Sequence, residues 1–72
     1  MAIKFEIMEN ICTLSKSASG WTKELNLVSW NDREPKFDLR EWNEDHSKMS
    51  KGITFTNDEM KALKEAIEEL NI

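Results

Sequence analysis

The chain has 72 residues, a formal net charge of −4 and one cysteine, Cys12. A chain of this length forms one domain and buries only about 60% of its unfolded surface, so we expect association with a second copy to add stability. A lone cysteine excludes an internal disulfide and favours a reducing compartment. The sequence has neither a signal-peptide pattern nor an apolar run near the roughly 20 residues of a membrane span. These features predict a cytoplasmic protein, the nucleoid included, with no membrane partner.

The negative charge is concentrated at the C-terminal end. Residues 56–72 hold five acidic and two basic side chains, whereas residues 1–55 are close to neutral. A near-neutral segment that carries local basic stripes is compatible with a polyanionic partner. The net charge therefore does not exclude nucleic acid.

The first two predicted strands are long. Residues 3–14 alternate around Phe5 and become apolar again at Ile11, which predicts one strand with a bulge near Glu9-Asn10. A small polar segment that ends at Gly20 predicts a loop, and residues 21–30 then alternate as a second strand. Turn-forming residues at 31–35 lead into the third strand.

The third predicted strand, residues 36–42, has two chemically different sides. Phe37 and Leu39 lie on one side, which we predict to be the core, and Lys36, Arg40 and Trp42 lie on the other. We predict that the second side is open to solvent. Two cations and an indole on an open sheet surface suit a partner with a charged backbone and planar rings.

The rest of the chain predicts a short strand and a helix. Residues 43–50 are a polar loop, and residues 51–55 predict a fourth strand with Ile53 and Phe55 facing inward. Thr56 and Glu59 have the spacing of a capping box, so a helix is expected over residues 57–71. One helical face carries an apolar stripe: Met60, Leu63, Ile67 and Leu70. The predicted fold is α+β, a four-stranded antiparallel meander with a C-terminal helix over one face.

The candidate nucleic-acid-binding residues are aromatic and basic. Trp30 and Trp42 share strand parity with Lys36 and Arg40, although Glu24 and Asp38 have the same parity and make the stripe mixed. Stacking of a base on an aromatic ring contributes about 1–3 kcal/mol whatever the base. Further candidates come from the first strand, the Ser/Gly loop and the next turn: Lys4, Trp21, Lys23 and Arg33.

Nothing in the sequence indicates catalysis. His46 is the only histidine and lies in a polar loop, and Cys12 lies on a strand as a small apolar residue. Neither a zinc-type Cys/His set nor a glycine-rich phosphate loop is present. We predict a non-enzyme without a metal or another cofactor.

The segment Asp38-Leu39-Arg40-Glu41-Trp42, then Met49 and Lys51-Gly52-Ile53-Thr54-Phe55 before a capped helix, resembles the positive cofactor four family of single-stranded-DNA-binding transcriptional coactivators. The segment from Gly20 to Trp30 is similar to the small bacterial YdbC-like branch. The resemblance covers nearly the whole chain. It implies a homodimer built through the C-terminal helices, with the apolar stripe at the interface, and a curved sheet that binds unpaired DNA in transcription regulation, replication or repair.

Two other classes of function use the same surface. A protein-interaction module, in which the sheet accepts a peptide or the acidic helix binds a basic partner such as a transcription protein, suits the net charge more directly. An RNA chaperone would use the same aromatic and basic side chains. Salt dependence and competition between DNA and RNA separate these classes, because polyanion binding weakens steeply as salt rises.

Overall fold

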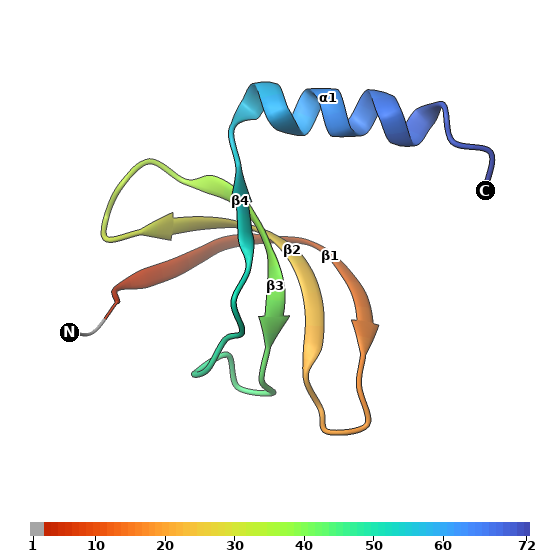
Figure 1. Cartoon of the computed structure of the whole chain (residues 1–72). Helices are drawn as coiled ribbons and strands as arrows, with labels where there is room; N and C mark the ends of the chain where they lie inside the picture. Colours follow the sequence, from red (N-terminus) through yellow and green to blue (C-terminus); the bar gives the residue numbers. More distant parts are fainter. Residues whose placement is uncertain (1–2) are drawn as a thin grey trace.

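Residues 3–72 are described by a computed structural model, and they form one antiparallel sheet followed by a helix (Figure 1). The strand order is β1-β2-β3-β4, so each strand pairs with its neighbour in sequence. The predicted four-stranded meander with a C-terminal helix is confirmed. The elements are β1 (Phe5–Lys16), β2 (Thr22–Trp30), β3 (Lys36–Trp42), β4 (Ile53–Phe55) and α1 (Asn57–Glu68).

The predicted boundaries are best at β3, and elsewhere they differ by up to three residues. The bounds of β3 are those predicted, and β1 and β2 each differ by at most two residues at either end. β4 starts at Ile53 and not at residue 51, and α1 ends at Glu68 and not at residue 71. Leu70, predicted to lie on the helix, therefore follows it.

β1 contains three bulges at regular spacing. Its register against β2 shifts between Ile7 and Glu9, again between Asn10 and Cys12, and again between Thr13 and Ser15. The extra residue at each shift is apolar and exposed: Met8, Ile11 and Leu14, with 50%, 40% and 56% exposure. A bulge bends its strand and increases the local twist. Three of them in one strand explain why the sheet is strongly curved (Figure 1).

The curvature reverses the predicted burial of the two sheet faces. The side of β3 that we expected to be open lies on the concave face, where Trp42 and Asp38 have no exposed surface. The side that we expected to be core, with Phe37 and Leu39, is only half-buried, and Ile53 beside Leu39 is 55% exposed. The expected assignment of core and open faces is therefore wrong, because a curved sheet encloses its concave side chains and spreads those on its convex side.

The helix begins at the predicted capping box and covers little of the sheet. The Thr56 hydroxyl accepts a hydrogen bond from the Glu59 amide at 3.1 Å, and the Glu59 carboxylate accepts one from the Thr56 amide at 2.8 Å. Within the described residues α1 contacts β3 and β4 but neither β1 nor β2. All of α1 except Met60 is exposed, including Leu63 and Ile67. The apolar stripe is thus largely uncovered in a single chain.

Candidate nucleic-acid interface

The strand register places aromatic side chains at both ends of the concave face. Phe5 pairs with Trp30 at one end, and Trp42 pairs with Thr22 at the other. Because the sheet curls, these ends meet: the Phe5 ring centroid is 5.9 Å from that of Trp30 and 5.2 Å from that of Trp42. Phe5 and Trp30 remain half-exposed, whereas Trp42 is fully buried. The three rings form an aromatic cluster with one covered and two accessible members.

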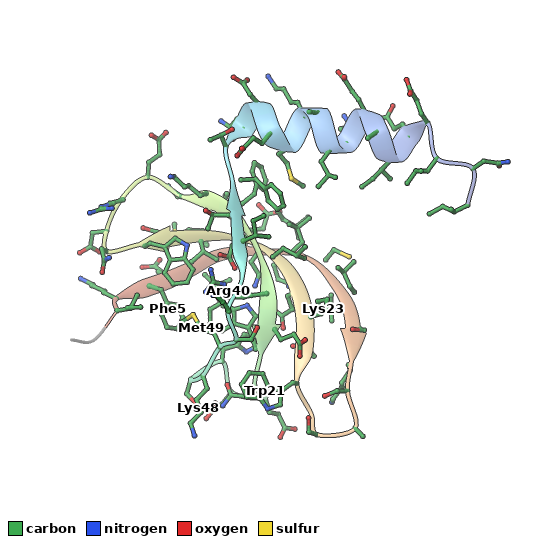
Figure 2. All side chains as sticks on the ribbon, viewed as in Figure 1. Phe5, Trp21, Lys23, Arg40, Lys48 and Met49 are labelled. Atoms are coloured by element: carbon green, nitrogen blue, oxygen red, sulfur yellow. The ribbon has the colours of Figure 1, made fainter. Side chains whose placement is uncertain are left out.

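Arg40 extends this cluster with a planar cation. Its guanidinium lies 4.6 Å from the Trp30 ring centroid, and its Nη1 lies 3.2 Å from Met49 Sδ. Its Nε and Nη2 each donate a hydrogen bond to the buried Asp38 carboxylate at 2.7 Å. This bidentate pair fixes the plane of the guanidinium and partly neutralises its charge. Figure 2 shows Phe5, Arg40 and Met49 together on the concave side of the sheet.

Gly52 provides the space that Arg40 occupies. A Cβ at position 52 would lie 2.5 Å from Arg40 Cβ, 2.7 Å from Arg40 Nε and 2.7 Å from the Leu39 carbonyl oxygen. Two of these three atoms belong to the first part of the Arg40 side chain or to the backbone, so the clash cannot be relieved cheaply. A glycine is therefore required here for close approach, which gives the Lys-Gly-Ile segment a physical role in the site.

A polar cluster centred on Glu24 fills the next part of the concave face. Glu24 is 4% exposed, and it accepts hydrogen bonds from the side chains of Thr22, Asn26, Asn10 and His46. Burial by itself raises the pKa of Glu24, but the hydrogen bonds from Thr22, Asn26 and His46 outweigh it and hold the pKa below its ordinary value. The carboxylate is therefore ionised at neutral pH.

The predicted site residues do not all lie together. Trp30, Trp42, Lys36 and Arg40 share the concave face through the β2–β3 register, whereas Lys23 lies opposite Glu41 on the convex side. Trp21 is half-exposed and lies at the end of the sheet away from α1 (Figure 2).

The remaining predicted cations lie around the turn between β2 and β3. Lys36 is exposed, as is Arg33 in the turn before it. Lys4 forms an exposed ion pair with Asp32 at 2.8 Å, an arrangement that contributes little to stability.

Sequence reasoning missed three residues that the structure adds to this surface: Phe5, His46 and Met49. Phe5 had been grouped with the apolar alternation of the first strand. Only the pairing of β1 with β2 shows that it lies on the face of Trp30. The Trp42–Met49 bridge brings the second half of the polar loop against the end of β3. No local sequence signal marks these contacts, because they depend on the pairing of β1 with β2 and on the path of the loop after β3.

The arrangement is a curved antiparallel sheet with an aromatic and guanidinium surface suited to stacking, on which Phe5 and Trp30 are half-exposed and the Arg40 side chain is 14% exposed. Among residues 3–72 no cluster of three or more His, Cys, Asp or Glu side chains could hold a metal ion. Within the same residues, no helix is both long and apolar enough to span a membrane.

Comparison with known proteins identifies the family. The model of the Transcriptional Coactivator p15 (PC4) family matches residues 17–66. An uncharacterized protein of Treponema pallidum (strain Nichols) is 43% identical over 68 residues, which are 94% of this chain and 80% of the relative. The chain belongs to the PC4 family, a non-enzymatic family of nucleic-acid-binding domains whose members bind single-stranded DNA.

Proposed function

We propose that this protein binds single-stranded DNA with little sequence preference, through the half-exposed surface formed by Phe5, Trp30, Arg40 and Met49, which we call the stacking surface. The observation that carries the proposal is the Arg40 guanidinium held over the Trp30 ring at 4.6 Å by a buried carboxylate. Bases stack both on aromatic rings and on guanidinium planes. Every base has a face to stack, so such a surface discriminates weakly between sequences.

The charge distribution supports a binding mode in which stacking contributes more than ion pairing. Arg40 shares its charge with Asp38, and Lys4 shares its charge with Asp32. Lys36 and Lys48 are exposed, and no carboxylate pairs with either within the described residues. We therefore expect few phosphate contacts per protomer and a modest dependence of affinity on salt. The proposed location is the cytoplasm, where transcription and repair expose single strands.

The proposed binding unit is a homodimer associated through the C-terminal helices. Leu63 and Ile67, which continue the Met60 side of α1, are 37% and 52% exposed, and Leu70 just after the helix is 56% exposed. A hollow lined by Phe37, Met60 and the stems of Lys61 and Lys64 lies between helix and sheet. Exposed apolar side chains at helical spacing gain free energy when a second copy covers them.

The experiment is a comparison of three labelled oligonucleotides by fluorescence anisotropy: one single-stranded DNA, the same sequence as a duplex, and the same sequence as RNA. We expect the single-stranded DNA to bind most tightly, because the duplex hides the base faces that the stacking surface needs. Equal affinity for single strand and duplex would contradict the proposal. Preference for RNA over DNA would indicate that the protein binds RNA in place of DNA.

A further inference from the structure

The loop between β3 and β4 holds His46 in a defined position. The His46 amide donates a hydrogen bond to the Asn43 carbonyl at 3.0 Å, and the Asn43 amide donates one to the Lys48 carbonyl at 3.1 Å. His46 adopts a left-handed conformation with φ of 60°, which is uncommon outside glycine. The loop therefore turns back on itself and directs this residue toward the sheet.

Two contacts orient the imidazole ring on the concave face. Its Nε2 lies 2.9 Å from Oε2 of Glu24, which is itself buried and anchored by other donors. Its ring centroid lies 5.6 Å from that of Trp42 with an interplanar angle of 34°. The His46 side chain is 39% exposed, whereas Trp42 beneath it has no exposed surface. At this point of the concave face, a ligand meets the imidazole and not the indole.

The imidazole also borders a hollow of about 360 Å³. The other lining side chains come from β1 and β2: Ile7, Asn10, Thr13 and Glu24. Asn10 and Thr13 are exposed polar residues, and Ile7 is half-buried. An exposed planar ring beside a hollow with polar side chains at its edge is the arrangement that accommodates a nucleobase, with one face for stacking and polar groups for its rim.

We infer that His46 contacts the bound single strand, positioned by Glu24 and supported from behind by Trp42, and that it makes binding tighter when the imidazole is protonated. The inference rests on the proposed function and adds a contact to it. A neutral imidazole offers only a stacking face. An imidazolium adds a positive charge that attracts phosphate and strengthens stacking on a base.

The charged surroundings of His46 are simple. From β2 it faces Glu24, from β3 it faces Trp42, and the residues facing it from β1 are uncharged. The charged side chains of its own loop are Glu44, Asp45 and Lys48. Glu24 stays ionised across the range in which histidines change charge, about pH 5 to 8, because its pKa is below the ordinary value. Protonation of the imidazole therefore adds a positive charge at this place while the Glu24 carboxylate keeps its negative charge.

The test measures the affinity of an oligothymidylate of about 20 nucleotides at about pH 5.5 and about pH 7.5, at a constant salt concentration near 0.1 M. Thymine does not titrate in this range, and His46 is the only histidine of the chain. We expect the wild type to bind more tightly at the lower pH by at most about fivefold. One full phosphate contact on a single strand adds about 0.7 to the salt exponent, which is a factor of about five near 0.1 M salt, and the pairing of His46 with Glu24 reduces that gain.

Three variants separate the inference from its alternatives. His46→Gln should lose the pH dependence and bind at both pH values like the wild type at the higher pH or more weakly. His46→Arg carries a permanent charge and should bind more tightly at the higher pH than His46→Gln. Glu44→Gln, a control in the same loop, should retain the pH dependence. Circular dichroism at both pH values establishes that each protein compared is folded.

Two results would overturn the inference. Suppose that the wild type binds the oligothymidylate and that folded His46→Gln binds as tightly as the wild type at each of the two pH values. His46 is then not a contact, and the proposed function stands. If the wild type does not bind the oligothymidylate at low salt, the proposed function fails, and the inference fails with it.

Discussion

The two faces of the sheet differ in how far contacts within a single chain bury their side chains. On the concave face, Asn26, Asp38 and Trp42 have no exposed surface, and the buried carboxylates of Asp38 and Glu24 have hydrogen-bond donors. On the convex face, apolar side chains are half-buried, Ile53 is 55% exposed, and α1 presents an apolar stripe. Contacts within the chain thus bury most of the concave face, although the buried indole nitrogens of Trp30 and Trp42 have no hydrogen-bond partner there. We expect a second copy to cover the convex face.

This difference assigns separate roles to side chains of the same type. Trp42 is enclosed and contributes to stability, whereas Trp30 is half-exposed and available to a ligand. Leu63 on α1 is exposed although it is apolar, and Glu24 is buried although it is charged. Substitutions at these positions should therefore affect stability, association and binding differently.

The largest effect is expected from Trp42→Ala. The ring is fully buried between Phe5 and His46, so its removal leaves a cavity in the concave face. Large-to-small core substitutions of this type cost about 3–5 kcal/mol of the free energy of unfolding. Urea denaturation measures the loss. A folded variant with unchanged midpoint would show that Trp42 is not part of the core.

The second prediction concerns the convex side. Leu63→Glu places a charge in the apolar stripe, and we expect the dimer to weaken by about 3 kcal/mol, roughly a hundredfold in its dissociation constant. Analytical ultracentrifugation measures the change. Glu65→Gln, at an exposed position of the same helix, is the control and should leave the dimer intact. A wild type that sediments as a folded monomer at micromolar concentration would contradict the dimer altogether.

Trp30→Ala tests the accessible member of the aromatic cluster. We expect a folded protein whose affinity for single-stranded DNA falls by about 1–3 kcal/mol, since a stacking partner is lost. Anisotropy titration measures affinity, and circular dichroism measures folding. Loss of folding with no change in the affinity of the folded fraction would place Trp30 in the core with Trp42.

These contrasts also explain how far sequence reasoning reached. The element order, the bounds of β3 and the Thr56–Glu59 capping box follow from local patterns, and they were predicted correctly. The burial of the two faces does not follow from them, because it depends on the curvature that three bulges in β1 produce. Alternation shows that Asp38 and Trp42 share a face of the sheet, but it does not show that the side chains on this face become buried.

The candidate site was predicted in part for the same reason. Trp30, Lys36 and Arg40 do share a face, as their parity in neighbouring strands indicated. The pairing of Arg40 with Asp38 within one strand and its stacking on Trp30 depend on side-chain geometry. His46 reaches the concave face only because its loop contains a left-handed residue, which composition did not indicate.

The fourth prediction concerns acid stability and the buried Glu24. Its folded pKa lies below the ordinary value of 4.5, so its contribution to stability is present above that value and is lost as the pH falls through the folded pKa. We expect Glu24→Gln to cost about 1–2 kcal/mol at neutral pH and to make stability less sensitive to acid. Thermal unfolding followed from neutral pH downward measures both. If the stability of the variant depends on acid equally steeply, other carboxylates cause the acid dependence.

The smallest effect is expected from Lys36→Ala. Lys36 is exposed at the edge of the concave face, so its removal should leave folding unchanged and reduce the slope of log affinity against log salt by about 0.7 if its charge meets a phosphate. Lys61→Ala on the helix is the matched control and should leave the slope unchanged. Equal slopes in the wild type and both variants would place the bound backbone away from Lys36.

The most direct test of the central claim is a nuclear magnetic resonance titration of the isotope-labelled protein with single-stranded DNA. The account predicts that the largest shift changes fall on the concave side, at Phe5, Trp30, Arg40, His46 and Met49. Signals of Leu25 and Leu27 on the convex face and of Leu63 on α1 should change little. Shift changes concentrated on α1 or the convex face, with the concave residues unaffected, would contradict the account.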